Sequence, residues 1–278
     1  MSAALLRVRD LSLHQGGQCL IDQLNLTIHS GECWAILGRN GAGKTSLLHT
    51  LAAVRPVPHG QIELLDQPLS AWKPKLRARH IGLLTQEPAE GFEANVLEAV
   101  QSGRHPYLES WSDRANDDAN IVQQALETCG LQSFATRRIN SLSGGERRRL
   151  GIATLLAQNP PLMLLDEPLN HLDMAWQWCI LRQLRSLADQ GHALMMSLHD
   201  PNMALRNCTH ALLMHEHGAW QAGRVDELLT PANLHAVYGL SLRPLQDGCD
   251  TWFVPEQTHA EPSLATASRN ALLSSHDD

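Results

Sequence analysis

The stretch that decides the fold reads Gly38-Arg39-Asn40-Gly41-Ala42-Gly43-Lys44-Thr45, directly after the apolar run 34–37. Its glycines let the backbone turn N–H groups toward a phosphate, and the Lys44 ammonium can reach β- and γ-phosphate oxygens. The Thr45 hydroxyl can hold Mg²⁺ at the start of a helix predicted over 46–53. If the stretch binds no ligand, it is simply a turn between a strand and a helix. In this strand-loop-helix context it predicts an ATP or GTP site made by Gly38, Arg39, Asn40, Gly41, Ala42, Gly43, Lys44, Thr45 and Ser46.

The composition is that of a globular chain. Its 278 residues are 43% hydrophobic, which suffices for one sizeable α/β domain with an insertion or for two modest domains. The formal net charge of −7 gives no global basic footprint, so we expect no nucleic-acid partner. The 6 cysteines are scattered without a CxxC pair, which favours reduced, buried thiols over disulfides or zinc ligands.

No segment of the sequence predicts membrane insertion or secretion. The longest apolar runs, such as 162–165 and 194–196, are far shorter than the ~20 residues that span a bilayer. The stretch Met1–Arg7 lacks the basic start and the long apolar core of a signal peptide. We therefore expect the chain to stay in the cytosol.

The period of the apolar residues changes along the chain. Alternation over 5–29 around the turn 14–17 predicts an antiparallel hairpin, followed by short strands at 33–37, 61–65 and 80–85. From 95 to about 159 the period is helical, which predicts a helical insertion.

After the insertion the pattern returns to that of a parallel sheet. Strands are predicted at 162–165 and 193–198, separated by a helix over 176–190. A last hairpin is predicted at 211–214 and 220–222, then a small helix at 225–229. The aperiodic residues 256–278 predict a mobile tail.

Two acids follow the apolar run 162–165. Ligands of parallel sheets bind at the carboxyl ends of the strands, which places Asp166 and Glu167 toward the phosphates. Asp166 can orient the shell of Mg²⁺, and Glu167 can polarise a water for attack on the γ-phosphate. By itself such a pair is equally well explained as a solvated turn. Together with the glycine-rich loop it predicts nucleotide hydrolysis.

Between these elements lies Leu142-Ser143-Gly144-Gly145-Glu146, which opens a helical run. Ser143 is a candidate N-cap, and a glycine-flanked helix N-terminus offers free N–H donors to a phosphate. If the segment binds no phosphate, it is simply the capped start of a helix. With this segment the chain resembles the ATP-binding cassette ATPases, whose signature Leu-Ser-Gly-Gly-Gln/Glu completes the ATP site of a second subunit in a head-to-tail dimer.

The resemblance covers residues 5–255 and implies roles for three more residues. Gln86 matches the glutamine that approaches Mg²⁺ and the attacking water and senses the membrane partner. His199 matches the switch histidine that hydrogen-bonds the γ-phosphate, and Asp173 matches the D-loop that couples the two ATP sites. A lone glutamine or histidine at a strand end is usually structural. The implied catalytic residues are Glu167, His199 and Gln86, and the implied Mg²⁺ ligands are Thr45, Gln86 and Asp166.

The resemblance also implies the architecture. The expected fold class is α/β: a P-loop NTPase (RecA-like) core with a parallel sheet, an N-terminal antiparallel β-subdomain and an inserted α-helical subdomain. We expect a single ATPase domain over 1–255, with a catalytic core at 1–86 and 159–255 and a helical subdomain at 87–158.

The resemblance further implies cofactors, partners and location. ATP and Mg²⁺ are the implied cofactors. A second copy of the chain and integral-membrane permease subunits are the implied partners, and a periplasmic or extracellular substrate-binding protein would act indirectly. The ATPase would then lie on the cytoplasmic face of the inner membrane.

One position departs from the family pattern. The family stacks the adenine on an aromatic residue near position 15, whereas this chain has His14-Gln15. Because stacking is the usual way to hold a base, either the His14 imidazole substitutes or adenine binding is weaker. The sequence leaves these alternatives open.

A second, less specific resemblance concerns the transported substrate. The segments 96–100 and 102–108 and His199-Asp200 are similar to the subfamily that takes up iron-siderophores, haem and cobalamin. In that subfamily a V-x-x-G-R-x-P-x-L stretch touches the permease. If the segment has no such role here, it is simply an amphipathic helix that ends in a turn at Pro106. An importer of zinc, manganese or molybdate, or an exporter, would share every catalytic residue, since the cassette does not select the cargo.

Two classes outside transport fit less well. A soluble cassette protein of DNA repair carries a long coiled coil and one of translation carries two cassettes, whereas this chain has one set of motifs and a short insertion. A non-catalytic nucleotide-binding regulator would lack Glu167 or His199, and both are present. The sequence therefore favours an ATPase subunit of a transporter.

Overall fold

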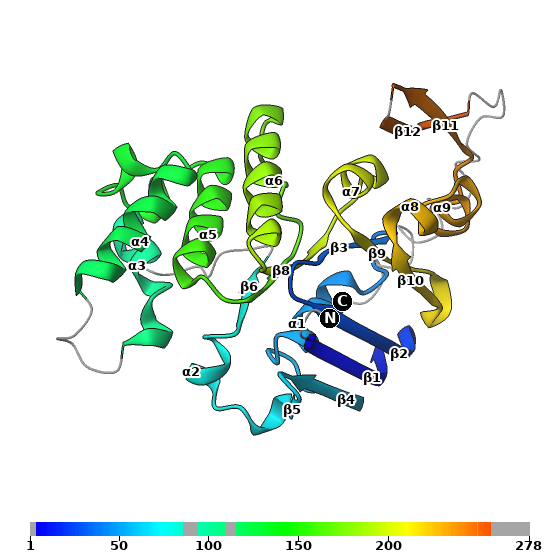
Figure 1. Cartoon of the computed structure of the whole chain (residues 1–278), viewed down its shortest axis with the longest axis horizontal. Helices are drawn as coiled ribbons and strands as arrows, with labels where there is room; N and C mark the ends of the chain where they lie inside the picture. Colours follow the sequence, from blue (N-terminus) through cyan, green and yellow to red (C-terminus); the bar gives the residue numbers. More distant parts are fainter. Residues whose placement is uncertain (1–3, 86–93, 109–114, 249, 257–278) are drawn as a thin grey trace, which may run out of the picture.

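The structure is a computed structural model that describes residues 4–85, 94–108, 115–248 and 250–256. A sheet of 6 strands runs through the middle of the molecule in the order β10-β9-β3-β8-β7-β6 (Figure 1). All neighbours in it are parallel except β10, which joins β9 in the antiparallel sense. The strands are β3 (Cys33–Gly38), β6 (Ile81–Leu84), β7 (Leu162–Leu165), β8 (Ala193–Ser197), β9 (His210–Met214) and β10 (Trp220–Arg224).

The inner strands of this sheet are buried on both faces. Side chains alternate in direction along a strand, so β3 contributes to two hydrophobic cores. Ala35 and Leu37 join the first core, on the face covered by the helices that follow β6 in the chain, and Trp34 and Ile36 join the second core, on the opposite face. The same alternation holds in β7, β8 and β9. Burial on both faces explains why β7 is an unbroken apolar run in the sequence.

An antiparallel sheet with the order β2-β1-β4-β5 packs against the second core. β1 (Ala4–Gln15) and β2 (Gln18–His29) form the predicted hairpin around Gly16 and Gly17, whose φ angles of 57° and 79° suit a two-residue hairpin turn. β4 (His59–Leu64) pairs with β1, and β5 (Gln67–Pro68) pairs with β4. The predicted N-terminal antiparallel subdomain is therefore confirmed.

Helices cover both faces of the parallel sheet. α1 (Lys44–Leu51) follows β3 and packs in the core shared with the antiparallel sheet. On the other face, α3 (Val96–Ser102), α4 (Ala115–Thr128) and α5 (Gly144–Gln158) stand together at one end of the molecule (Figure 1). The same core takes residues from α6 (Met174–Asp189), α7 (Pro201–Asn207), α8 (Val225–Leu228) and α9 (Pro231–Tyr238).

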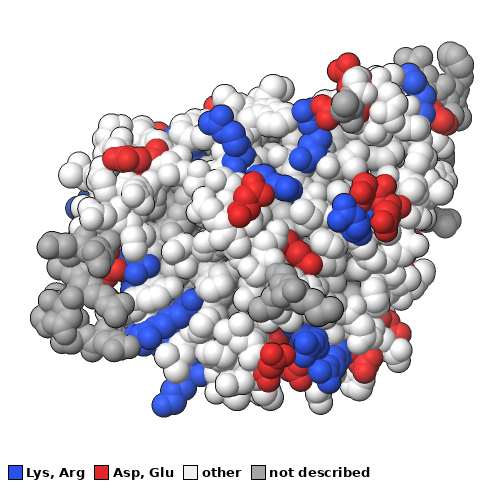
Figure 2. All heavy atoms as spheres, in the orientation of Figure 1, with Lys and Arg blue, Asp and Glu red and all other residues white. Residues whose placement is uncertain are grey.

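Short elements complete the chain. α2 (Pro74–Arg77) precedes β6, and β11 (Leu242–Asp247) pairs with β12 (Asp250–Pro255). Single 3₁₀ turns lie at Leu69–Ala71, His105–Tyr107, Gln132–Phe134, Ile139–Ser141 and Glu216–Gly218. Within the described ranges, no helix has the length and apolarity needed to cross a bilayer. Figure 2 shows basic and acidic side chains interspersed over one face of the molecule.

The predicted α/β class and the order of its main elements are confirmed. The sequence pattern does not predict α7, α9 or the hairpin of β11 and β12, because segments of 6 to 8 residues hold too few apolar positions to show a period. The predicted tail lies outside the described residues beyond Glu256.

The segment that resembles the permease-contacting stretch packs tightly against α5. A Cβ added at Gly103 would lie 2.4 Å from the Thr154 carbonyl oxygen, so α3 ends in direct contact with the α5 backbone. Arg104 Nη1 donates to the Ala157 carbonyl at 2.9 Å, and its Nε pairs with Asp118 at 2.8 Å. The Gly103-Arg104 pair therefore has a packing role within the helical group.

We predict that Gly103→Ala destabilises the chain by about 1–3 kcal/mol, since the added methyl group must displace the α5 backbone. Thermal or urea unfolding measures this loss. Gly223→Ala is the matched control, because a Cβ there has no heavy atom within 4 Å. Equal melting temperatures for the two variants would show that α3 and α5 are not packed this closely.

Candidate functional site

The phosphate loop (residues 38–45) connects β3 to α1 at the carboxyl end of the parallel strands. Gly41 and Gly43 have φ angles of 82° and 97°, a region that favours glycine. A Cβ at Gly43 would also lie 2.9 Å from the Leu20 Cβ. Because α1 begins directly after Gly43, the first N–H groups of α1 lack partners within the helix and can bind an anion.

Lys44 lies folded into the loop. Its Nζ donates to the carbonyl oxygens of Gly38 at 2.8 Å and of Arg39 at 3.1 Å, and the residue is only 6% exposed. Burial lowers the pKa of Lys44, whereas the nearby Glu167 and Asp166 carboxylates raise it. The structure therefore brings the predicted phosphate-binding cation within the electrostatic field of both predicted acids.

Asp166 directly follows β7, and its two carboxylate oxygens have different environments. Oδ1 accepts a hydrogen bond from the Ser197 hydroxyl at 2.7 Å. Oδ2 is fully buried and has no hydrogen-bond partner among the described residues. A buried carboxylate oxygen without a donor carries a desolvation cost that a cation would offset.

Glu167 follows in a left-handed backbone conformation, with φ at 48°, which is uncommon for a residue with a side chain. Its N–H donates to the Ser197 hydroxyl at 2.7 Å. Its Oε1 lies 2.9 Å from Nε2 of His199, and its Oε2 accepts from the Asn170 side-chain amide. The loops after β7 and β8 therefore bring together the two residues predicted to act on the γ-phosphate.

The signature segment (Leu142–Glu146) opens α5 through a capping box. The Ser143 hydroxyl accepts the Glu146 N–H at 3.2 Å, and the Glu146 carboxylate accepts the Ser143 N–H at 2.7 Å. The hydrogen bond from the Ser143 backbone is the main reason why the pKa of Glu146 is lowered. The predicted N-cap role of Ser143 is confirmed.

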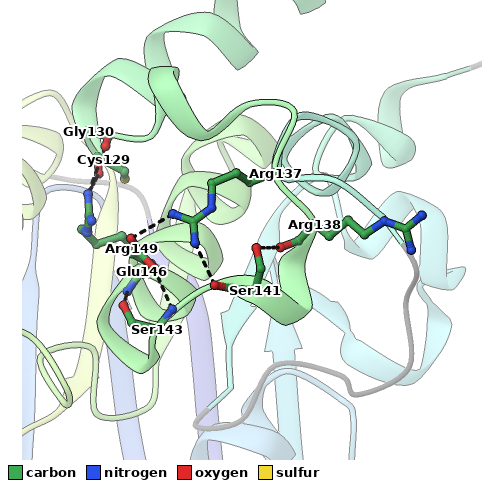
Figure 3. A network of polar contacts seen from close by, with 8 residues as sticks. All are labelled: Cys129, Gly130, Arg137, Arg138, Ser141, Ser143, Glu146 and Arg149. Atoms are coloured by element: carbon green, nitrogen blue, oxygen red, sulfur yellow. Dashed lines mark hydrogen bonds and ion pairs between the residues drawn. The ribbon is translucent and has the colours of Figure 1, made fainter.

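Two arginines hold the start of α5 from either side (Figure 3). Arg137 pairs with Glu146 at 3.4 Å and donates to the Ser141 carbonyl at 2.7 Å. Arg149 Nη1 donates to the Cys129 carbonyl at 2.7 Å, and its guanidinium lies 4.2 Å from the centre of the Trp176 ring. Because these contacts bind both flanks of the first turns, the N-terminus of α5 is presented by a fixed frame.

The signature segment also packs against the loop that precedes α6. A Cβ at Gly145 would lie 2.8 Å from the His171 carbonyl oxygen, so glycine is needed for this approach. Asp173 accepts the Trp176 N–H at 2.9 Å and caps α6. Among the described residues, no hydrogen bond joins the signature segment to the phosphate loop. A single copy therefore does not join the two halves of the predicted site in this way.

The hairpin turn reaches the start of α1 at the position where the aromatic residue is missing. The Gln15 side-chain oxygen accepts from the Ser46 hydroxyl at 3.1 Å, and Arg55 Nη1 donates to the same hydroxyl at 2.9 Å. A polar side chain anchored to α1 thus stands at this turn, while His14 is exposed beside it.

One predicted site residue lies outside the described part of the chain, and two residues that were not predicted contact the predicted acids. Gln86 lies outside the described residues, directly after Thr85. Ser197, fully buried at the end of β8, bonds both acids, and Asn170 bonds Glu167. The available sequence signal for Ser197 was a hydroxyl in an otherwise apolar strand, two residues before His199.

Comparison with known proteins yields consistent relatives. A family model described as ABC transporter matches residues 21–170. The hemin import ATP-binding protein HmuV of Pseudomonas entomophila strain L48 is 39% identical over 244 residues, which cover 86% of this chain and 94% of that protein. The ferric enterobactin transport ATP-binding protein FepC of Escherichia coli K12 is 34% identical over 247 residues, which cover 88% and 91%.

A solved structure agrees with these relatives. An inward-facing ABC transporter of the metal-chelate type, as its description assigns it, superposes with a TM-score of 0.77 at 29% identity. The superposition covers 91% of this chain and 98% of that chain. Fold and sequence therefore point to the same family.

We predict that Ser197→Ala lowers stability by about 1–3 kcal/mol, because it leaves Asp166 Oδ1 and the Glu167 N–H without their buried partner. The rate of nucleotide hydrolysis should fall as well, since both acids lose an anchor. Urea unfolding and phosphate release measure the two effects. Ser186→Ala, at an exposed serine of α6, is the control. An unchanged unfolding free energy in Ser197→Ala would contradict the assigned contacts.

Proposed function

Because this chain belongs to the ABC transporter family and is an ATPase, we propose that it powers an importer of haem or another iron chelate as two copies bound to a membrane permease. The observation that supports hydrolysis most directly is the contact of 2.9 Å between Glu167 and His199, next to the phosphate loop and Lys44. This cluster lies at the carboxyl ends of β3, β7 and β8, where parallel sheets bind their ligands.

We propose these roles for the residues that face the γ-phosphate. The carboxylate of Glu167 accepts the proton of the attacking water. Before ATP binds, Nε2 of His199 holds the Glu167 carboxylate in place, and once ATP is bound the imidazole N–H donates a hydrogen bond to the γ-phosphate. Lys44 leaves the carbonyls of Gly38 and Arg39 and neutralises the β- and γ-phosphates. The N–H groups at the start of α1 bind the remaining phosphate oxygens.

The donor set also fits a Mg²⁺ ion. The buried Oδ2 of Asp166, which has no hydrogen-bond partner in the described part of the chain, and the Thr45 hydroxyl are oxygen donors of the kind that Mg²⁺ prefers. Gln86 would be the third protein ligand. When bound, Mg²⁺ supplies a positive charge that stabilises the phosphate oxygens during transfer. Ser197 orients Asp166 for this purpose by engaging its other oxygen.

We propose that the second half of each ATP site comes from the other copy of the chain. The capping box and the two arginines hold the N-terminus of α5 in a form that can receive a phosphate. Ser143 and Gly145 of one copy would then close over ATP held by Lys44 of the other. Closure excludes water and aligns Glu167, and Asp173, just before α6, couples the two sites.

The proposed permease contact lies on exposed apolar side chains at the junction of the two chain segments 72–79 and 104–108. Leu76 and Leu108 are 44% and 42% exposed, and Lys75 between them donates to the Leu108 carbonyl. We propose that these two leucines form part of an interaction surface. The surface joins the proposed catalytic core, 1–86 and 159–255, to the proposed helical subdomain, 87–158, so a permease bound there would sense their relative movement.

The choice of an iron chelate as cargo is supported by the relatives. HmuV imports hemin and FepC transports ferric enterobactin according to their names, and both match this chain over most of their length. The same proposal places the chain on the cytoplasmic face of the inner membrane, served indirectly by an extracytoplasmic substrate-binding protein.

We predict that Glu167→Gln lowers ATP turnover about 100-fold or more, because the water loses its proton acceptor. ATP binding and ATP-dependent dimerisation should persist, since the amide keeps the shape of the side chain. Phosphate release measures turnover, and light scattering measures the dimer. Glu227→Gln, at an exposed glutamate of α8, is the control and should match the wild type. Near-normal turnover in Glu167→Gln would defeat the assigned role.

The same variant tests the transport function in cells. A strain whose sole copy carries Glu167→Gln should fail to grow with haem or a ferric chelate as its iron source, yet grow normally with ferrous salts. Normal growth on every chelate, with zinc or molybdate uptake lost instead, would refute the proposed cargo and leave the ATPase assignment intact.

We predict that Leu76→Asp combined with Leu108→Asp releases the chain from membranes that contain its permease, because the charges cannot be buried in an apolar contact. The fraction that sediments with washed membranes should fall several-fold. Leu245→Asp is the matched control, as Leu245 is 45% exposed on β11. Equal membrane fractions for both variants would place the permease contact elsewhere.

A further inference from the structure

Arg148 is a buried cation in the second turn of α5 whose side chain leaves the helical group and enters the catalytic end of the sheet. The residue is only 6% exposed. Its guanidinium donates to the backbone carbonyls of Thr85 at 2.7 Å and of Pro168 at 3.3 Å, and also to that of Asp166. Thr85 directly follows β6, Asp166 directly follows β7, and Pro168 lies two residues further along the same loop.

These carbonyls belong to the loops that place the catalytic side chains. Backbone carbonyls that leave a sheet lose their ladder partners and need another donor when they are buried. Arg148 supplies that donor to two adjacent strand ends at once, which only a forked guanidinium does with good geometry. The loop after β7 carries Asp166 and Glu167, so their backbone is attached to a side chain of the signature helix.

The guanidinium of Arg148 is held by the three backbone carbonyls named above. Burial lowers the pKa of Arg148 to about 10, while the nearby Asp166 and Glu167 charges act in the opposite sense. Arg148 therefore stays protonated at neutral pH. A buried charge costs free energy unless its donors are hydrogen-bonded, and here the acceptors that meet this need are carbonyls of the two strand ends.

The neighbouring arginine shows what a structural role looks like in the same helix. Arg149 donates to the carbonyls of Cys129 and Gly130, which follow α4, and stacks on Trp176 of α6. The partners of Arg149 are thus two carbonyls after a helix end and an aromatic ring, all outside the loops that carry the acids. Arg148 instead connects the helix that carries the signature segment to the strand ends that carry the acids.

We propose that Arg148 is a positioning residue for ATP hydrolysis: it couples the orientation of α5 to the placement of Glu167 within one copy of the chain. When the signature segment of α5 engages a phosphate in the second copy, a shift of α5 moves the guanidinium and, with it, the carbonyls of Asp166 and Pro168 on both sides of Glu167. In each copy, the position of the signature segment therefore affects the placement of Glu167 in the same copy. This inference rests on the proposed dimeric ATPase.

Steady-state kinetics of the full-length chain test the proposal with Arg148→Gln and Arg148→Lys. We expect kcat to fall about tenfold or more in Arg148→Gln, because small displacements of a catalytic group are costly, while KM and the affinity for ATP without Mg²⁺ change less than about threefold. Arg148→Lys, which keeps the charge but loses the fork, should lie between the wild type and Arg148→Gln. Arg182→Gln, at an exposed arginine of α6, is the control and should resemble the wild type.

Several outcomes would overturn the proposal. These are an unchanged kcat in Arg148→Gln, a parallel loss of kcat and ATP affinity, or equal defects in Arg148→Gln and Arg182→Gln. If Arg148→Gln does not fold, Arg148→Lys is judged by the same criteria, and failure of both to fold would show a purely structural role. Wild-type turnover and its loss in Glu167→Gln are measured in parallel, so that a failure of the proposed function is recognised separately.

Discussion

The parallel pairing of β3, β8 and β7 is the constraint on which the site depends. Parallel strands end at the same edge of a sheet, and each of these three is followed by a loop with chemically active residues. Lys44 follows β3, Asp166 and Glu167 follow β7, and His199 follows β8. Residues up to 155 positions apart in the chain thereby meet at one edge of the sheet.

Two side chains, Ser197 and Arg148, each form hydrogen bonds to more than one group at this edge of the sheet. One buried hydroxyl, that of Ser197, donates to Asp166 and accepts from the Glu167 N–H, which fixes the acids relative to β8. Arg148 performs a similar task from the opposite side through backbone carbonyls. Oδ2 of Asp166 is buried and has no hydrogen-bond partner among the described residues, which the proposed Mg²⁺ ion then explains.

The signature segment illustrates how far local sequence rules reach. A serine followed three residues later by glutamate predicts a capping box, and the structure has one at Ser143 and Glu146. The glycine at 145 has a cause that no local rule contains, because its missing Cβ makes room for the His171 carbonyl of a distant loop. Likewise Gly103 reads as a helix end, yet its environment is the backbone of α5.

Elements with a strong period or a strong motif could be predicted from the sequence alone. The buried strands, the first hairpin, the phosphate loop and the acids after β7 all fall in this group, since each signal lies within a few consecutive residues. The short helices α7 and α9 and the hairpin of β11 and β12 could not, because packing rather than periodicity stabilises such short segments.

The sequence by itself determined which residues are predicted to take part in the chemistry: the type and spacing of the loop 38–46, Asp166, Glu167 and His199 led to the roles proposed for them. Only the tertiary structure decided how they are held. Ser197 bonds Glu167 across 30 positions of sequence, and Arg148 bonds the Asp166 carbonyl beside Glu167 across 18. Contacts over such separations depend on how the strands and helices pack together. A linear pattern contains no record of that arrangement, because it arises from the packing of the two hydrophobic cores.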